Sequence, residues 1–524
     1  MKQALHIFRK DTRYLWPEIL ASLAALAMSA AWSPHTWSYT PTAMRWQGLV
    51  QLLPVLVFAT WALLAARLVQ AESLAGDRQW WITRPYEWKN LLAAKALFAV
   101  VWIYLPFVVE QAVVLREGGF SPYAYAAGWG MMMAVVSGWV VLPLLATAAV
   151  TENFVRMALT ACGIVAALVV GYDLVTMPRG GYDSTVPNDH HMWVVAVLMV
   201  GTAFVLVLQY ATRRTRRSRG LAAGVVLLAT CVAATLTATQ QSRIDRWYPA
   251  AAGAGPMQIA MPVKTKALYI QPLVRVGPSE RPGMMYVQVP VDFSGIAEGR
   301  AVQVDDVKIA IDDVRTGWHW TAPWWTSRAL HILPGTHRGQ VEIMLRKEQL
   351  KRFVAGSGTM QLTLAVTELQ ASTDAPAAIS PGDDLVVPGF GVCNADELNR
   401  FNQLICRSAM GQPPLTRVSA TWYPKECSPQ ERMPNAPLTA ATWAGSLQSS
   451  SARASLSTVQ LVLVNLYPDW HDGYDLYRTV GLPLCPGTVV HFTRYNPIGH
   501  ARVSVTLPSS YFQMAVPDNW RDER

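Results

Sequence analysis

The sequence predicts a membrane protein in two parts: an N-terminal α-helical transmembrane bundle of about seven spans, then a C-terminal, mostly-β, sandwich-like extracytoplasmic domain. Three observations lead to this fold class. Hydrophobic residues make up 52% of the 524 residues and charged residues only 15%, which is too apolar for an ordinary soluble chain. Apolar runs of roughly 18 to 25 residues recur up to about residue 240. Beyond about residue 245, short alternating runs replace them.

Each long apolar run can cross a hydrocarbon core of about 30 Å, and inside lipid it must do so as a helix because unpaired backbone groups are costly there. A transmembrane bundle over residues 15–240 follows. The predicted spans are Leu15–Ser33, Gly48–Gln70, Leu91–Leu115, Ala126–Val150, Met157–Thr176, Trp193–Tyr210 and Leu221–Ala238.

Basic residues gather in alternate connecting segments, most densely in the run RRTRRSRG directly before the last span. By the positive-inside rule the N-terminus is cytoplasmic, and an odd number of spans then places residues 245–524 on the opposite, extracytoplasmic side of the membrane. The net charge of +9 is explained by attraction to anionic lipid headgroups. No nucleic-acid recognition module is present, so the expected contact is the lipid bilayer and not nucleic acid.

The first 14 residues predict an amphipathic helix that lies in the cytoplasmic membrane interface. Leu5, Phe8, Leu15 and Trp16 share one side at helical spacing, and basic residues occupy the other. The alternative is a plain basic flank to the first span.

The outer half begins with a Pro/Gly/Ala-rich linker at residues 241–262, and residues 263–524 follow as a β-rich domain of one or two sandwiches. Runs such as MMYVQVPVDF, AVQVDDVKIAI and TVQLVLVNLY alternate with the two-residue period of half-buried strands. Two segments, KEQLKRFVAG and NADELNRFNQLICRS, predict short helices among these strands.

The cysteines divide between the two halves. Cys162 and Cys231 lie in spans, where they pack as small residues. An oxidising compartment permits two disulfides in the outer half, with the pairing left open. The candidates are Cys393, Cys406, Cys427 and Cys485. Zinc is the competing interpretation, but without a CxxC pair or nearby histidines no metal is expected.

The segment Ala71–Lys95 concentrates charge and tryptophan between two apolar runs. Carboxylates and guanidinium groups suited to paired hydrogen bonds alternate with indole rings that water does not favour. The loop therefore presses on the membrane surface or on a partner protein; as an alternative, the tryptophans are ordinary interfacial anchors. Its candidate residues are Glu72, Asp77, Arg78, Trp80, Trp81 and Arg84.

Three ionisable residues fall within predicted spans. Glu18 and Lys95 lie near cytoplasmic ends, so we expect their side chains to extend to the membrane edge. Glu110 lies deeper, and the cost of intramembrane charge predicts that it faces the bundle or a transport pathway, or else is a protonated, hydrogen-bonded structural residue.

The segments LHIFRKDTRYLWPEIL and LAGDRQWWITRPYEWKNLLAAKALF together resemble bacterial permease subunits of type-2 ABC transporters, in a subgroup with an extra span and a large extracytoplasmic domain. The resemblance covers about the first 240 residues; the seventh span departs from the six-span family core. It implies that the loop between spans two and three contacts a cytoplasmic ABC ATPase, which makes the loop residues named above the coupling candidates. It also implies pairing with a second permease copy or a related permease chain.

No GxxxxGK[ST] phosphate loop is present, so any ATP hydrolysis must come from a partner chain. HExxH and GxSxG are also absent, and neither an enzyme activity nor a cofactor is expected. The alternative function is a membrane-anchored extracytoplasmic binding or sensing protein without transport activity. An extracytoplasmic enzyme tethered by helices comes third.

Overall fold

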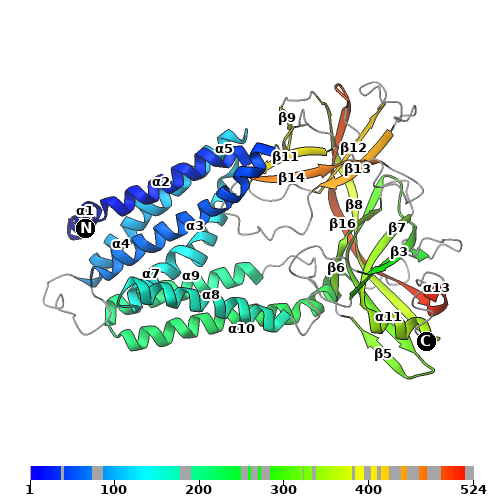
Figure 1. Ribbon diagram of the computed structural model, residues 1–524, viewed down its shortest axis with the longest axis horizontal. Coiled ribbons are helices and arrows are strands. Elements are labelled where there is room, and N and C mark those ends of the chain that lie inside the picture. The colour runs from blue at the N-terminus through cyan, green and yellow to red at the C-terminus, as the bar shows by residue number, and fades with distance from the viewer. Residues whose placement is uncertain are drawn as a thin grey trace. The chain divides into compact units, whose positions relative to one another are not determined.

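The structure is a computed structural model in which the chain forms two compact units. The first unit comprises residues 1–174, 189–235 and 375–492, and the second comprises 175–188, 236–374 and 493–524 (Figure 1). The structure describes residues 2–36, 41–72, 87–176, 190–248, 258–260, 269–272, 284–322, 324–332, 338–379, 384–394, 403–409, 415–423, 438–444, 459–468 and 485–513.

Helices occupy every range that the sequence predicts to span a membrane (Figure 1). After α1 (Lys2–Tyr14) they are α2 (Trp16–Trp32), α3 (Pro41–Gln70), α4 with α5 (Trp88–Ala99, Leu105–Glu117), α6 with α7 (Ala126–Val136, Leu142–Val150), α8 (Phe154–Thr176), α9 (His190–Thr212) and α10 (Thr215–Trp247). Over the described residues, five helical stretches are long and apolar enough to cross a membrane, or six if α1 and α2, bent by 74°, form one span.

Two predicted spans fall short of that test. The first predicted span is covered by α2, which has only 17 residues. The fifth is covered by α8, whose apolar stretch among the described residues, Phe154–Ala167, is shorter than a span. At the other end, α10 continues to Trp247, so the first residues of the predicted linker are helical. The prediction of a helical N-terminal region with apolar candidate spans is therefore confirmed.

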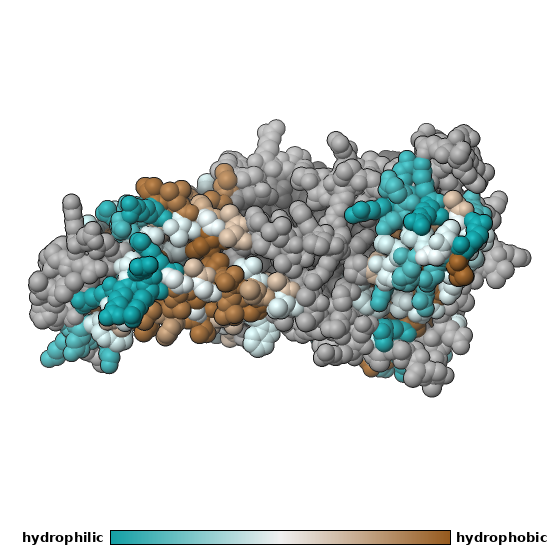
Figure 2. Space-filling view, turned by 90° about the horizontal axis from the view of Figure 1, so that it is seen from below, coloured by the Kyte–Doolittle hydropathy of each residue, from teal (hydrophilic) through white to brown (hydrophobic). Residues whose placement is uncertain are grey.

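The outward faces of these helices carry large apolar side chains, and Figure 2 shows this hydrophobic surface over the helical part, with hydrophilic residues beyond it at the left end of the view. Such a surface suits an apolar surrounding and not water. Half or more of each of the following side chains is exposed: Leu52, Val55, Val109, Leu159, Val200 and Leu228.

Two helical stretches contain a π-helical turn, at Val100–Tyr104 and at Ser137–Val141. A proline follows each turn, Pro106 in one stretch and Pro143 in the other. Because proline has no N–H for the helical ladder, the backbone widens just before it. The Tyr104 hydroxyl and the Ser137 hydroxyl are 2.7 Å apart, so the two turns lie side by side.

In the second unit two antiparallel groups of strands share one hydrophobic core. In the first group β3 (Met284–Ser294) pairs with β7 (Arg338–Arg346), β2 (Tyr269–Pro272) and β1 (Gln258–Ala260). In the second β4 (Arg300–Asp313) pairs with β8 (Thr359–Ala378), β6 (Trp325–Ile332) and β5 (Trp318–Thr321). The predicted helix KEQLKRFVAG is present as α11 (Lys347–Ala355), which packs into this core with α13 (Ser509–Gln513) through Phe353 and Phe512.

The strands of the first unit enclose a separate core. One sheet runs in the order β14 (Val459–Asn465), β11 (Gln403–Ala409), β10 (Gly391–Asn394), β9 (Asp384–Val387), and β12 (Thr416–Trp422) pairs with β13 (Leu438–Ala444), which pairs with β15 (Tyr467–Pro468). The long strands β8 and β16 (Val489–Pro508) contribute residues to both cores. The β half therefore has two cores.

The helix predicted over NADELNRFNQLICRS is wrong for its second half. Gln403–Ala409 is β11, hydrogen-bonded to β10 on one side and β14 on the other. Pairing with a strand more than 50 residues further along the chain outweighs the local helical pattern, as is common for short apolar segments.

Candidate functional site

Many polar contacts of the helical region lie where α3 ends, where α4 begins, and at the α7–α8 and α9–α10 turns. They join residues that are far apart in the sequence: Asn90 of α4 donates to Gln3 of α1 at 2.8 Å, and Gln70 of α3 donates to Thr151 after α7 at 3.3 Å. We call this region the polar end. The Ala71–Lys95 segment begins and ends there.

A buried ion cluster joins three elements at the polar end. The Lys95 ammonium of α4 lies 2.7 Å from the Asp11 carboxylate of α1 and 3.2 Å from the Glu72 carboxylate, just after α3. The exposed fractions of the three side chains are 4%, 9% and 16%, respectively. Buried charges persist only when they are paired, so this cluster holds α1, the end of α3 and α4 in one arrangement.

Apolar contacts continue the attachment of α1 along α4. Phe8 meets Phe98 edge to face with ring centres 6.4 Å apart, and Ile7 is buried. Further along, the Trp102 indole donates to the Thr12 hydroxyl at 3.1 Å. Helix α1 is therefore fixed to α4 over its whole length, with its basic side chains Arg9, Lys10 and Arg13 exposed.

Tyr210, near the end of α9, interacts with the cluster through electrostatics. Its side chain is almost fully buried and interacts electrostatically with both Glu72 and Asp11. Among the described residues its hydroxyl has no hydrogen-bond partner.

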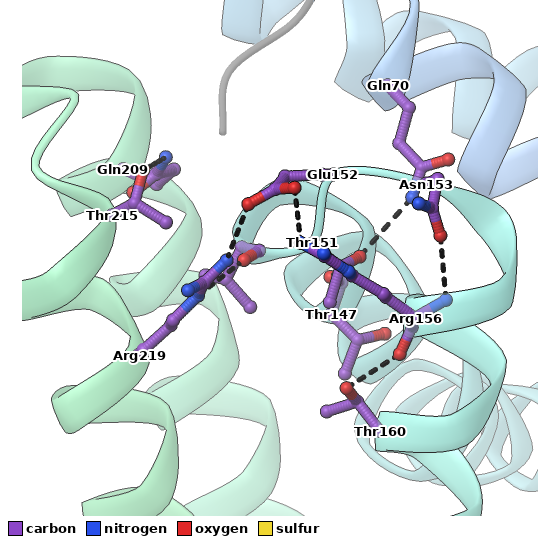
Figure 3. Close-up of polar contacts among 11 residues, drawn as sticks. Gln70, Thr147, Thr151, Glu152, Asn153, Arg156, Thr160, Gln209, Thr215 and Arg219 are labelled. Carbon is purple, nitrogen blue, oxygen red and sulfur yellow. Dashed lines mark hydrogen bonds and ion pairs between the residues drawn. The ribbon is translucent and has the colours of Figure 1, made fainter. Parts of the chain in front are cut away.

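A second polar cluster surrounds the α7–α8 turn (Figure 3). Arg219 of α10 donates to the Val150 carbonyl at the end of α7 at 2.9 Å, and its guanidinium lies 3.7 Å from the Glu152 carboxylate. Glu152 also contacts Arg156, whose backbone N–H donates to the Asn153 side chain at 2.9 Å. An arginine thus caps the carbonyl end of one helix and Asn153 caps the start of the next.

Of the predicted coupling residues, the structure describes Glu72, which takes part in the ion cluster. The others, Asp77, Arg78, Trp80, Trp81 and Arg84, lie outside the described residues.

The prediction that Lys95 extends to the membrane edge is wrong, because Lys95 is buried and paired. Glu18 pairs instead with Arg67 of α3 at 3.2 Å. Glu110 of α5 faces α2 and is buried: the Ser29 hydroxyl donates to it at 3.0 Å, and Gln111 also donates to it. Its surroundings are therefore those of a hydrogen-bonded residue inside the bundle.

The cysteines agree in part with the expectation. Cys393 and Cys406 form a disulfide between opposed positions of β10 and β11; Cys485 is also disulfide-bonded, and Cys427 lies outside the described residues. Cys162 and Cys231 are free thiols. Within the described ranges, no three His, Cys, Asp or Glu side chains come together in a way that could hold a metal ion.

No protein-family model matches the chain, and no curated protein matches its sequence. Among solved structures, Pseudomonas fluorescens alkylpurine DNA glycosylase AlkC bound to DNA containing an abasic site analog aligns with 67% of this chain and 94% of its own, at 10% identity and a TM-score of 0.14. A TM-score this low carries no argument about fold or function.

Proposed function

We propose that this chain is the permease subunit of an ABC-type transporter in the inner membrane of a bacterium. Its N-terminus would be cytoplasmic, its seven helical ranges would span the membrane, and its β half would be extracytoplasmic. A separate cytoplasmic ATPase would drive it through the Ala71–Asn90 loop between the second and third spans. The apolar outward faces of the helices and the basic residues around the polar end support this placement.

The observation that carries the proposal is the buried ion cluster. Glu72 is the last described residue before the segment that would contact the ATPase, and Lys95 binds both Glu72 and Asp11. A displacement of the segment therefore acts on α1 and α4 together. A connection of this kind is what a subunit needs if force applied at one end of a bundle is to move whole helices.

The two π-helical turns support the same proposal from within the bundle. Helices bend most readily where the regular ladder is interrupted. The Tyr104–Ser137 contact joins two such interruptions, so a tilt of α4 relative to α5 would reach the α6–α7 stretch at that point. The apolar outward faces would contact lipid and a second permease copy or a related chain.

The test is a pull-down of tagged full-length chain from its native membrane in mild detergent, with mass spectrometry of the bound proteins and an ATPase assay. We expect an ATPase in stoichiometric amount. The Asp77→Ala/Arg84→Ala variant should lose this partner and still insert and purify normally. Its matched control, Asp312→Ala/Arg315→Ala, removes a carboxylate and an arginine from the exposed β4–β5 turn and should keep the partner.

Two results would count against the proposal. An ATPase that binds the loop variant as well as the wild type would remove the loop from the interface. Recovery of the intact wild-type chain without any ATPase would remove the energy source of the transporter.

A second candidate is a membrane-anchored binding or sensing protein, and the two separate cores of the β half favour it. A β half of this size offers more surface than an anchor requires. In the same pull-down, this candidate predicts a kinase or regulator in place of the ATPase.

A further inference from the structure

A buried carboxylate of the second unit lies beside Tyr248, the residue that follows α10. Asp305 of β4 is 2% exposed, and the hydroxyl of Tyr248, the residue after α10, donates to its Oδ2 at 2.9 Å. Gln303 donates to its other oxygen at 2.7 Å. Tyr248 itself is buried and packs with Trp324 and Ala365. Among the described residues, the Tyr248–Asp305 hydrogen bond joins the residue that follows α10 to strand β4.

A β-bulge in β4 directs the Asp305 side chain toward Tyr248. Val304 pairs with Val366 of β8 and Asp306 pairs with Ala365, so Asp305 is the extra residue on β4. The bulge also changes which residues face the core: Val302 and Val304 lie in it before the bulge, and Val307 and Ile309 lie in it afterwards. An inserted residue that re-aims one side chain is a usual role of a bulge.

A short chain of hydrogen bonds leads from Asp305 to the surface. The buried Thr367 hydroxyl of β8 donates to Asp305 and lies 2.9 Å from Nδ1 of His500, which is on β16 and is exposed. The His500 ring also meets the Tyr248 ring edge to face, with ring centres 5.2 Å apart. Asp305, Thr367 and His500 therefore connect a buried acid to water through one hydroxyl.

The hydrogen bonds that link Asp305, Thr367 and His500 can point in either of two directions, because the Thr367 hydroxyl can both donate and accept. With Asp305 ionised, Thr367 donates to it and His500 must donate from Nδ1. With Asp305 protonated, the acid can donate to Thr367, and Thr367 can donate to a neutral His500. The Gln303 amide oxygen is buried without a hydrogen-bond partner among the described residues, so a turned amide would offer the acid proton a second acceptor.

We propose that Tyr248, Asp305, Thr367 and His500 form a proton-controlled tie between the end of α10 and the β4 bulge, closed when Asp305 is protonated and His500 is neutral. The tie loosens when Asp305 loses its proton, because a carboxylate that is 2% exposed and lies beside the buried Asp306 is costly to hold as an anion. It also loosens when His500 gains a proton. The pH of the solution around the β half would then set how firmly the end of α10 is held by β4. The inference does not depend on the ATPase partner.

The electrostatics agree with this direction. The pKa of Asp305 is raised to about 7, chiefly by burial and also by the neighbouring Asp306 carboxylate, against the hydrogen bonds from Thr367, Tyr248 and Gln303, which lower it. The exposed His500 ring is also partly desolvated where it meets Tyr248 and Thr367, and this lowers its pKa. A raised acid pKa means that the closed tie binds the proton more tightly than the open one, so closure is favoured at low pH and lost as the pH rises toward 7.

The titration of His500 changes the stability of the tie with pH in the opposite direction. Its closed-state pKa is depressed, so its contribution is lost as the pH falls below the ordinary histidine value of about 6.5. Lys308, a basic residue of β4, has its amine 5.9 Å from the centre of the Trp324 ring. The two titrations therefore oppose each other below about pH 6.5, and above it the Asp305 titration acts alone.

The experiment is hydrogen exchange with mass spectrometry on the full-length chain in detergent from pH 5 to 8, corrected for the intrinsic rate. It follows peptides covering residues 244–250 and 300–310. In the wild type, protection should fall as the pH rises to 7, by at most about tenfold per pH unit, the limit for one proton. Asp305→Asn should abolish this fall or reverse it. His500→Gln should make it at least as steep.

His319→Gln is the matched control, because His319 also contacts an aspartate, Asp312, but on the exposed surface. It should follow the wild type at every pH. If Asp305→Asn does not fold, Tyr248→Phe keeps the ring packing, removes the hydroxyl, and should lower protection of residues 244–250 throughout. A fall in protection that persists in Asp305→Asn, or a wild type without any pH dependence in this range, would overturn the proposal.

Discussion

Replacing Lys95 with methionine tests the buried ion cluster. Methionine fills similar volume but leaves the Asp11 and Glu72 carboxylates, 9% and 16% exposed, facing each other without a cation. Removing one partner of a buried ion pair typically costs about 3–5 kcal/mol because of the uncompensated charge that remains. We expect a loss of that order in the free energy of unfolding, measured by denaturing-detergent titration in mixed micelles.

Two comparison variants make this magnitude interpretable. Arg156→Met breaks a pair whose side chains are 59% and 39% exposed, and an exposed pair contributes only about 0–1 kcal/mol. The triple variant Lys95→Met/Asp11→Asn/Glu72→Gln removes all three charges together, and should recover most of the loss because neutral replacement of a buried ion group is often tolerated.

Hydrogen exchange gives the local readout for the same variant. The amides of α1 should exchange faster in Lys95→Met than in Arg156→Met, because α1 loses its attachment to α4. If Lys95→Met costs no more than Arg156→Met, or if the triple variant is as unstable as the single one, the cluster does not hold α1 and the coupling argument fails.

Three further predictions concern other buried groups. Thermal stability of the full-length chain should fall between pH 5 and 7, by at most about 1.4 kcal/mol per pH unit, because burial raises the pKa of Asp305 to about 7; Asp305→Asn should flatten the profile in a fluorescence melting series. Cys393→Ser should cost about 2–3 kcal/mol, since the disulfide closes a loop with a sequence separation of 13; reductant should cost the variant less than the wild type, because only the disulfide of Cys485 is left for it to reduce. Glu110→Gln, which keeps an acceptor for Ser29, should change the unfolding free energy by less than about 1 kcal/mol, whereas Glu110→Leu should cost about 1–3 kcal/mol by leaving buried donors unpaired.

The sequence predicts the elements of this protein better than their contacts. Apolar runs of about 20 residues are a strong signal, and helices occupy all of those ranges. Two-residue alternation likewise identifies strands such as β3 and β4. The errors arise where distant residues decide the outcome, as in β11, whose neighbour β14 follows after a long insertion.

The bulge at Asp305 corresponds to a break in the alternation of apolar and polar residues in the sequence. In VQVDDVKIAI the apolar residues occupy even positions up to Val304 and odd positions from Val307 onward. Such a change of phase within one strand requires an extra residue, and the two aspartates between the apolar runs are where that residue must be. What the sequence does not indicate is the partner, because Tyr248 lies 57 residues away.

The ion cluster shows the same limit and a similar local signal. Lys95 and Asp11 are 84 residues apart, so only the packing of α1 on α4 brings them together. Within α1, however, Asp11 is the single acidic residue in a helix whose other charged residues are basic. A basic helix on a membrane surface gains nothing from an acid on its exposed side, so that acid is better placed facing inward toward a cation. The lysine within the apolar run of α4 is the complementary signal, because a cation there also needs a partner. Two isolated charges, each out of place in its own element, therefore point to each other more strongly than either does alone.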